Sequence, residues 1–230
     1  MALLIRFILN KGSLHGKELV RKDLVEAMGK QRTTIAAKNG LPNGYALGIA
    51  SRDRHGVTGI AHSGNIIGYK AMLYIFPEAG KVFFVSYNMD SETANYEVFS
   101  ERFIDLLAIP TVSPAALVKE QAQAPFSPEK WQGYYVPSIT KIQPLQLLDR
   151  IGSFTRVKAT KNGLLLMPAQ KNRIVLFGQA NGLFKEAGKI DYAYCFYENN
   201  NGEKFLTNGL QTLQQINGWG LLLEISSVIV

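Results

Sequence analysis

The sequence predicts an α+β protein in which an antiparallel sheet with flanking helices is followed by a small antiparallel β-barrel. Three observations lead to this fold class. Residues 45–88 contain two pairs of β-like runs separated by short turns, which is the pattern of β-hairpins. Residues 95–107 carry apolar side chains at helical spacing. After Trp131, short β-like runs recur between Asn-Gly turns, which is typical of a barrel or a curved sheet.

The segment before the predicted sheet is expected to contain two short helices and a turn. Leu4, Phe7 and Ile8 recur at helical spacing, and the Asn-Lys-Gly sequence at 10–12 ends that helix. Leu24, Val25 and Met28 mark a second helix, which is predicted to stop at Gly29. The turn-forming sequence NGLPNG then leads into the sheet.

The predicted sheet consists of strands at 45–51, 57–62, 69–76 and 81–88. The last two strands are apolar on both faces, and such strands usually lie centrally in a sheet that is covered on both sides. The helix at 95–107 supplies cover for one face. Little else in the chain is available for the other face, so we expect that face to be exposed and a covering segment to be missing from this chain.

The chain is expected to divide at a linker. Residues 109–127 contain three prolines and several alanines and glutamines, which is typical of a connecting segment. The predicted domains are therefore a domain at 1–108 that contains the sheet, a β-rich domain of about six strands at 128–215, and an apolar tail at 216–230. The tail is shorter than a membrane-spanning helix and contains a glutamate, so a membrane contact and a buried terminal element both remain open.

Composition excludes several kinds of site. The net charge is +7, but the basic residues are dispersed without a run of five, so no nucleic-acid partner is expected. The single cysteine rules out an intrachain disulfide and a cysteine-based zinc site. The three histidines lack metal-binding spacing, and the phosphate-binding and dinucleotide-binding glycine motifs are absent. We therefore expect neither a metal nor a cofactor.

An ordered series of motifs runs through residues 45–88. It reads Y-A-L-G-I, G-I-A-H-S-G-N-I-I-G-Y, F-P-E-A-G-K and V-F-F-V-S-Y-N. This series resembles the final third of the catalytic domain in serine hydrolases of the β-lactamase and penicillin-binding-protein type. The upstream sequence LNKGSLHGKELV resembles the segment before that sheet in the same family, so the resemblance implies that residues 1–108 are a partial β-lactamase-like catalytic domain. From Trp131, the sequence W-Q-G-Y-Y resembles the lipocalin-like domain that some of these hydrolases carry after the catalytic domain.

The resemblance implies a substrate-binding strand at His62-Ser63-Gly64. In the family, the strand with H-x-G or K-T-G forms one wall of the cleft. His62 matches its basic position, Ser63 its hydroxyl position and Gly64 its small position, where substrate lies close to the strand. The N–H group of the next residue, Asn65, would complete the oxyanion hole. The implied substrates are small molecules or peptides with an amide or ester bond.

The family's catalytic Ser-x-x-Lys motif is not found where it belongs, which is upstream of His62. Two literal matches, Ser127 to Lys130 and Ser138 to Lys141, lie downstream, and we reject both as chance matches. Tyr197-Glu198-Asn199 matches the family's Tyr-x-Asn motif but falls in the predicted β-domain, and we reject it also.

The functional hypothesis is therefore a truncated serine hydrolase that is inactive alone because its nucleophile is missing. The alternative is a non-enzymatic module that binds a ligand or partner on the same scaffold. The resemblance favours the periplasm or cell envelope, although the N-terminal residues do not form a signal peptide.

Overall fold

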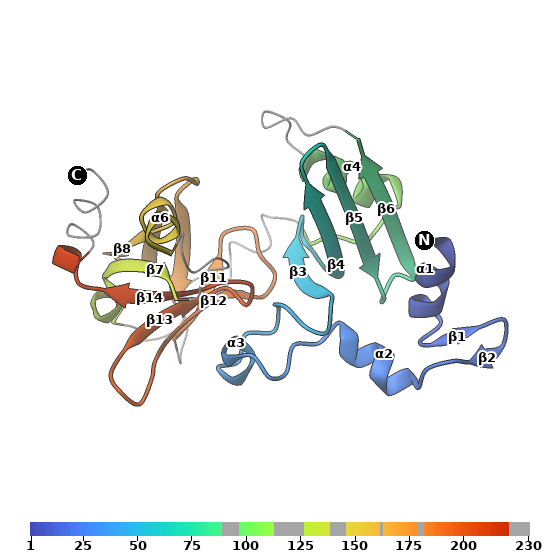
Figure 1. The fold of residues 1–230 in the computed structure, drawn as a ribbon, viewed down its shortest axis with the longest axis horizontal. Coiled ribbons are helices and arrows are strands. Elements are labelled where there is room, and N and C mark those ends of the chain that lie inside the picture. Colours follow the sequence, from blue (N-terminus) through green and yellow to red (C-terminus); the bar gives the residue numbers. More distant parts are fainter. Residues whose placement is uncertain (89–96, 113–126, 139–145, 162, 179–181, 221–230) are drawn as a thin grey trace. The chain divides into compact units, whose positions relative to one another are not determined.

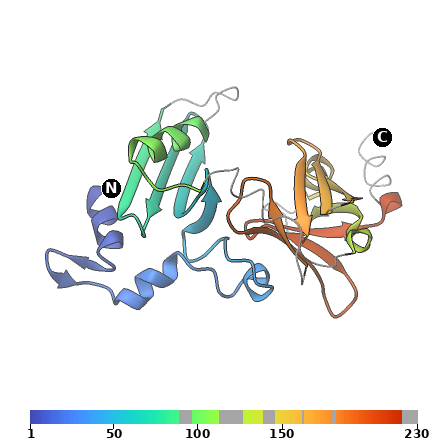
Figure 2. The same cartoon turned by 180° about the vertical axis from the view of Figure 1, so that it is seen from behind.

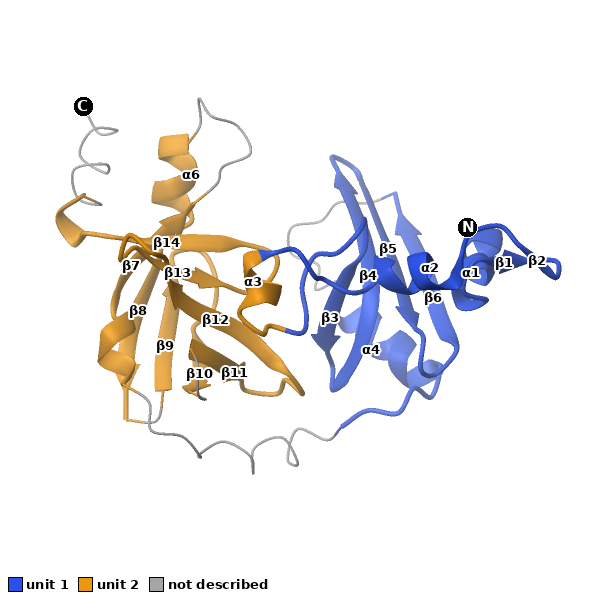
Figure 3. Ribbon diagram, turned by 90° about the horizontal axis from the view of Figure 1, so that it is seen from below, with its two compact units in different colours: residues 1–34, 42–113 blue, residues 35–41, 114–230 orange. Residues whose placement is uncertain are grey.

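The computed structural model describes residues 1–88, 97–112, 127–138, 146–161, 163–178 and 182–220. The protein is α+β, with a four-stranded antiparallel sheet and a separate closed barrel of eight antiparallel strands. It divides into two compact units (Figure 3). The first consists of Met1–Thr34 and Pro42–Ser113, and the second of Ile35–Leu41 and Pro114–Val230. The predicted α+β class and barrel are thus confirmed.

The sheet of the first unit contains its strands in sequence order (Figure 1). They are β3 (Ala50–Arg54), β4 (Val57–Ile66), β5 (Tyr69–Phe76) and β6 (Lys81–Tyr87). The first strand begins later than predicted because the preceding peptide forms a tight turn. The amide of Ala46 donates to the carbonyl of Ile49 at 2.9 Å, and Gly48 has φ +76. Positive φ is readily adopted by glycine, which makes Gly48 well suited to this turn.

One face of the sheet is covered by α4 (Glu97–Leu106), which lies in front of the strands in Figure 2. Ile104 of this helix belongs to the same buried cluster as Tyr74 and Phe76, whose rings stack at 4.7 Å. Gly59 of β4 leaves room for the Tyr74 ring, because a Cβ atom at this position would overlap it. The lack of a side chain in β4 is thus matched by a large aromatic side chain in β5.

The opposite face is half covered by the N-terminal helix α1 (Ala2–Leu9). Ile8 packs in a buried cluster with Leu73 and Ile75, so the prediction that little in this chain covers the second face is wrong for this half. At the other end of the same face, Ile66 and Tyr69 are 69% and 59% exposed. Apolar surface therefore remains uncovered near the β4–β5 turn.

Four short elements follow α1 before the chain enters the sheet, and the last of them, α3 (Ile35–Lys38), belongs to the second unit. Strands β1 (Ser13–Leu14) and β2 (Lys17–Glu18) pair as a two-stranded antiparallel ribbon. Helix α2 (Lys22–Met28) then contributes Met28 to the cluster around Ile8. Both predicted N-terminal helices are therefore present.

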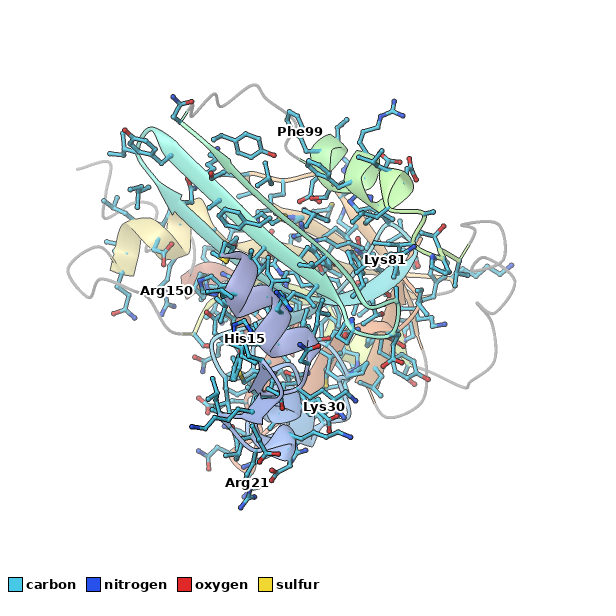
Figure 4. The ribbon with its side chains drawn as sticks, turned by 90° about the vertical axis from the view of Figure 1, so that its right-hand side faces the viewer. His15, Arg21, Lys30, Lys81, Phe99 and Arg150 are labelled. Carbon is cyan, nitrogen blue, oxygen red and sulfur yellow. The ribbon has the colours of Figure 1, made fainter. Side chains whose placement is uncertain are left out.

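Two contacts hold α4 against β6. They involve Lys81 of β6 and Phe99 of α4, both labelled in Figure 4. The Lys81 ammonium donates to the carbonyl oxygens of Leu107 and Ala108 at 2.5 Å and 2.9 Å. These carbonyls end the helix, where partial negative charge accumulates and a cation is favourable. At the start of the helix, the Phe99 ring lies 5.3 Å from the ring of Tyr87.

The second unit is an up-and-down barrel in which each strand pairs with its sequence neighbours and β14 closes the ring against β7. Its strands are β7 (Gly133–Pro137), β8 (Thr155–Thr160), β9 (Gly163–Pro168), β10 (Ile174–Gly178), β11 (Leu183–Glu186), β12 (Tyr192–Glu198), β13 (Lys204–Thr207) and β14 (Thr212–Ile216). The sequence predicted about six strands. β8 places charged Arg156 and Lys158 outward, and β11 has only four residues, so both give weak strand signals.

One end of the barrel is closed by a 3-10 helix, η1 (Pro128–Trp131). The Trp131 ring packs 5.5 Å from the ring of Phe196, and the hydroxyl of Tyr135 donates to the Trp131 carbonyl at 3.0 Å. Helix α6 (Gln146–Gly152) lies in the connection between β7 and β8. The barrel core is thus sealed by aromatic side chains at the η1 end.

Residues 35–41 belong to the barrel unit although they precede the sheet in sequence. They contain the short helix α3 (Ile35–Lys38). Ala36 and Leu41 are 3% and 2% exposed and form a buried cluster with Cys195 of β12. Burial raises the pKa of the free Cys195 thiol to about 11. This segment therefore covers the outer side of one barrel strand.

Parts of the predicted linker and of the apolar tail lie outside the described residues. Within the described part of the chain, no helix has the length and apolarity needed to cross a bilayer.

Candidate functional site

The four predicted site residues, His62 to Asn65, lie together in β4 and are all exposed. β3 pairs only with residues 57–61 of β4, whereas β5 continues to pair as far as Ile66. Among the described residues, the segment 62–66 therefore has a partner strand on one side only. Alternate residues of an antiparallel strand turn their N–H and C=O groups to opposite edges. Some peptide groups of this segment consequently face the edge without a strand, where a ligand can meet them.

His62 is held by a backbone carbonyl of the turn before β3. Its Nδ1 atom lies 2.6 Å from the carbonyl oxygen of Gly48. A carbonyl oxygen only accepts hydrogen bonds, so Nδ1 carries the proton. In the neutral ring, Nε2 is then an acceptor. The motif pattern did not indicate this role of Gly48, although the glycine of Y-A-L-G-I is the signal that could have located the turn.

The strand places the four side chains on two different faces. His62 lies opposite Leu73, on the face covered by α1, and Gly64 shares that face because side chains alternate along a strand. Ser63 lies opposite Met72, on the face covered by α4, and Asn65 shares that face. A continuous binding surface made from all four residues must therefore use the edge of the strand and its backbone groups.

The space next to Gly64 is open. A Cβ atom built at this position would meet no atom of the described residues within 4 Å, apart from its chain neighbours. Gly64 and Asn65 line a wide hollow of about 580 Å³, together with Tyr69 of β5 and Tyr87 of β6. No side chain in the described part of the molecule therefore demands glycine at position 64, and the open space there can accept a ligand group.

The rejected serine–lysine matches lie in the second unit. Lys130 pairs with Glu198 at 2.9 Å, and its ammonium lies 4.9 Å from the centre of the Trp131 ring. The hydroxyl of Ser138 donates to the carbonyl of Thr212 at 2.9 Å. Lys141 lies outside the described residues.

The Tyr-x-Asn match is part of the barrel structure. The Tyr197 ring stacks on that of Phe205 at 5.1 Å, and Asn199 accepts hydrogen bonds from the amides of Asn201 and Glu203. Within the described residues, no group of three potential metal-ligating side chains comes together.

Comparisons with known proteins give structural neighbours but no family. No family model matches the sequence, and no curated protein matches it. A crystal structure of SurE is 18% identical with a TM-score of 0.46, and covers 93% of this chain. A structure of SurE with D-Leu is 18% identical with a TM-score of 0.45, and covers 88% of this chain. The octameric penicillin-binding protein homologue from Pyrococcus abyssi is 17% identical with a TM-score of 0.33, and covers 92%.

The present chain spans less than half the length of each of these three, at 47%, 45% and 45%. The structural neighbours thus include a penicillin-binding protein homologue, whereas no family model places the sequence among β-lactamases.

Proposed function

We propose that His62 to Asn65 form one wall of an acyl-transfer cleft in a serine hydrolase of the β-lactamase and penicillin-binding-protein type. The observation that carries this proposal is the part of β4 that continues past β3: among the described residues it has a partner strand on one side only, its residues are exposed, and the space next to Gly64 is open. An amide or ester substrate can lie along such an edge as an additional strand does, bonded to the backbone.

The wall would bind and polarise the substrate. In acyl transfer, a serine attacks the carbonyl carbon and negative charge develops on the carbonyl oxygen. An N–H group that faces the free edge stabilises this charge because it is already oriented toward it. The resemblance assigns this donor to Asn65. His62, fixed by the Gly48 carbonyl, supplies a polar group on the α1 face next to the same edge.

The nucleophile is the part of the mechanism that this wall does not provide. Ser63 supplies a hydroxyl within the wall, but its side chain lies on the α4 face, and the rejected serine–lysine matches belong to the barrel unit. We therefore expect the 230-residue chain to bind substrate at the wall without turning it over.

The first experiment measures turnover. The purified chain is incubated with nitrocefin and with p-nitrophenyl acetate, and with a fluorophosphonate probe that labels activated serines. We expect no enzymatic hydrolysis and no labelling. Robust hydrolysis that is abolished by Ser127→Ala or Ser138→Ala would overturn the proposal, because the nucleophile would then lie in the barrel unit.

The second experiment tests binding at the wall. Benzylpenicillin is titrated into ¹⁵N-labelled protein, and the expected shifts are at the amides of residues 62–66. Gly64→Val fills the open space and should remove these shifts. Thr58→Val, on the same strand but away from the free edge, serves as the matched control. Shifts confined to other regions, or unchanged in Gly64→Val, contradict the proposal.

A further inference from the structure

A second cavity lies at the end of the barrel opposite η1. It has a volume of about 260 Å³, and the residues that line it belong to the ends of β9 and β13, the starts of β8, β10, β12 and β14, and the neighbouring loops. Gly152, at the end of α6, also lines it. The cavity is therefore lined by residues of the barrel unit alone. It shares none of them with the β4 wall, the proposed substrate-binding segment from His62 to Asn65.

The inner part of this cavity is apolar. Leu166, Leu206 and Leu213 line it and also belong to the barrel core, with exposures of 2%, 2% and 8%. They are contributed by three different strands, so the surface is fixed by the closed barrel rather than by a loop. A ligand that reaches these side chains must bring an apolar group, because they offer no hydrogen bond.

Uncharged hydrogen-bonding groups lie along the same cavity. Thr155 is 5% exposed, and Tyr194 hydrogen-bonds with the side chain of Asn208. Burial, with a smaller contribution from the carboxylate of Glu186, raises the pKa of Tyr194 well above its usual range. The phenol therefore stays neutral and keeps its proton for donation. Glu186 itself is not among the described lining residues and is engaged in an interaction of its own.

The only charged side chain among the described lining residues is Lys171, which is exposed at the rim. None of the ion pairs between described residues involves it. The cavity thus combines an apolar inner end with a positive charge at its mouth. This distribution fits a molecule with an apolar tail and one negative charge.

The volume limits the size of such a molecule. It lies below the range of roughly 300–1,000 Å³ that holds drug-sized ligands. Since one water occupies about 30 Å³ of liquid, the cavity has room for about nine water-sized groups. A straight-chain carboxylate of about eight carbons matches this size, whereas a long-chain fatty acid does not fit within it.

We propose that the open end of the barrel binds a medium-chain monocarboxylate, with its tail on Leu166, Leu206 and Leu213 and its carboxylate at Lys171. This site is independent of the β4 wall and requires no catalysis.

The test uses the full chain with sodium octanoate and, as the uncharged analogue, octanamide. Binding is followed by the ¹³C methyl signals of the leucines and by calorimetry. We expect saturable shifts at Leu166, Leu206 and Leu213 with octanoate, and weaker binding of octanamide. If octanoate does not bind saturably, or shifts only residues outside the barrel, the proposal is wrong.

Two variants separate the roles of charge and cavity. Lys171→Gln should weaken octanoate binding about fivefold, the range of an exposed ion pair, and leave octanamide binding unchanged. Lys158→Gln, an exposed lysine on the outside of β8, is the matched control and should change neither. Ala169→Phe, at the rim, should block both ligands. Equal loss of octanoate binding in both lysine variants would show a general charge effect and overturn the site.

Discussion

The imidazole of His62 donates from Nδ1 to the carbonyl oxygen of Gly48 at 2.6 Å, and so links the exposed part of β4 to the turn before β3. The turn can accept this bond because Gly48 has φ +76, which points its carbonyl in a direction that other residues reach at a cost. The orientation of a candidate site residue therefore depends on a glycine fourteen residues earlier in the chain.

Gly48→Ala tests this dependence. The new methyl group meets no atom of the described residues within 4 Å, so the expected loss of about 1 kcal/mol in unfolding free energy comes from backbone strain. The His62 ring should also lose its fixed tautomer, which ¹⁵N chemical shifts of the imidazole detect. Gly64→Ala is the matched control, since its φ is not in the positive region and its surroundings are equally open. An unchanged His62 spectrum in Gly48→Ala would contradict the link.

Tyr74 should make the first unit sensitive to alkaline pH. Burial raises its pKa to about 12, above the value of about 10 expected in the unfolded chain. The unfolded state therefore loses this proton first. The stability contribution is fully present below pH 10 and is lost as pH rises through about 12, at up to about 1.4 kcal/mol per unit of pKa difference. Unfolding in urea at pH 8 and at pH 11.5 measures the change.

Tyr74→Phe isolates this contribution. It removes the hydrogen bond from the hydroxyl to the Arg52 carbonyl at 3.2 Å and should cost about 1 kcal/mol at pH 8. Between pH 8 and 11.5, however, the variant should lose less stability than the unsubstituted protein. Equal alkaline losses in the two proteins would show that other groups cause the effect.

Lys81→Met should destabilise the contact between β6 and the end of α4. The substitution keeps the aliphatic length but removes the donor to the carbonyls of Leu107 and Ala108. Because the ammonium is partly exposed, we expect a loss of about 1–2 kcal/mol, measured by denaturant unfolding. Lys17→Met on the exposed strand β2 is the control and should have little effect. Similar losses in both variants would point to total charge rather than to this contact.

Leu41→Ala should expose the Cys195 thiol. The lost side chain is 2% exposed, so truncation should cost about 2–4 kcal/mol in stability. In the unsubstituted protein, burial and the raised pKa of Cys195 keep the thiol unreactive toward Ellman's reagent. The variant should react faster under native conditions. Ile35→Ala, at an exposed side chain of α3, should leave the thiol protected.

The hairpins were predictable because local signals determine them. The turn Pro77 to Gly80 sits between two apolar runs, and the structure pairs Phe76 with Lys81 on either side of it. The strand that carries His62 was placed for the same reason. Strands β8 and β11 were harder to predict, since one alternates with charged residues and the other is short.

Contacts between distant residues were not predictable from the sequence. Nothing near Leu41 indicates that it packs against Cys195, which lies in a strand formed from much later residues. The bond between His62 and Gly48 is similarly a property of the folded turn. At the β4 wall, the sequence could therefore indicate which residues lie in the strand, but not how His62 is oriented.

The packing of residues 35–41 on β12 also constrains the order in which parts of the molecule can fold. During synthesis, Leu41 leaves the ribosome long before Cys195, so it must wait unpacked while the sheet unit is already able to form. The outer side of β12 is therefore covered by residues 35–41, which are synthesised before any barrel strand. Cleavage of the chain between residues 109 and 127 would leave this piece on the other fragment, and the barrel fragment would then fold without its cover over Cys195.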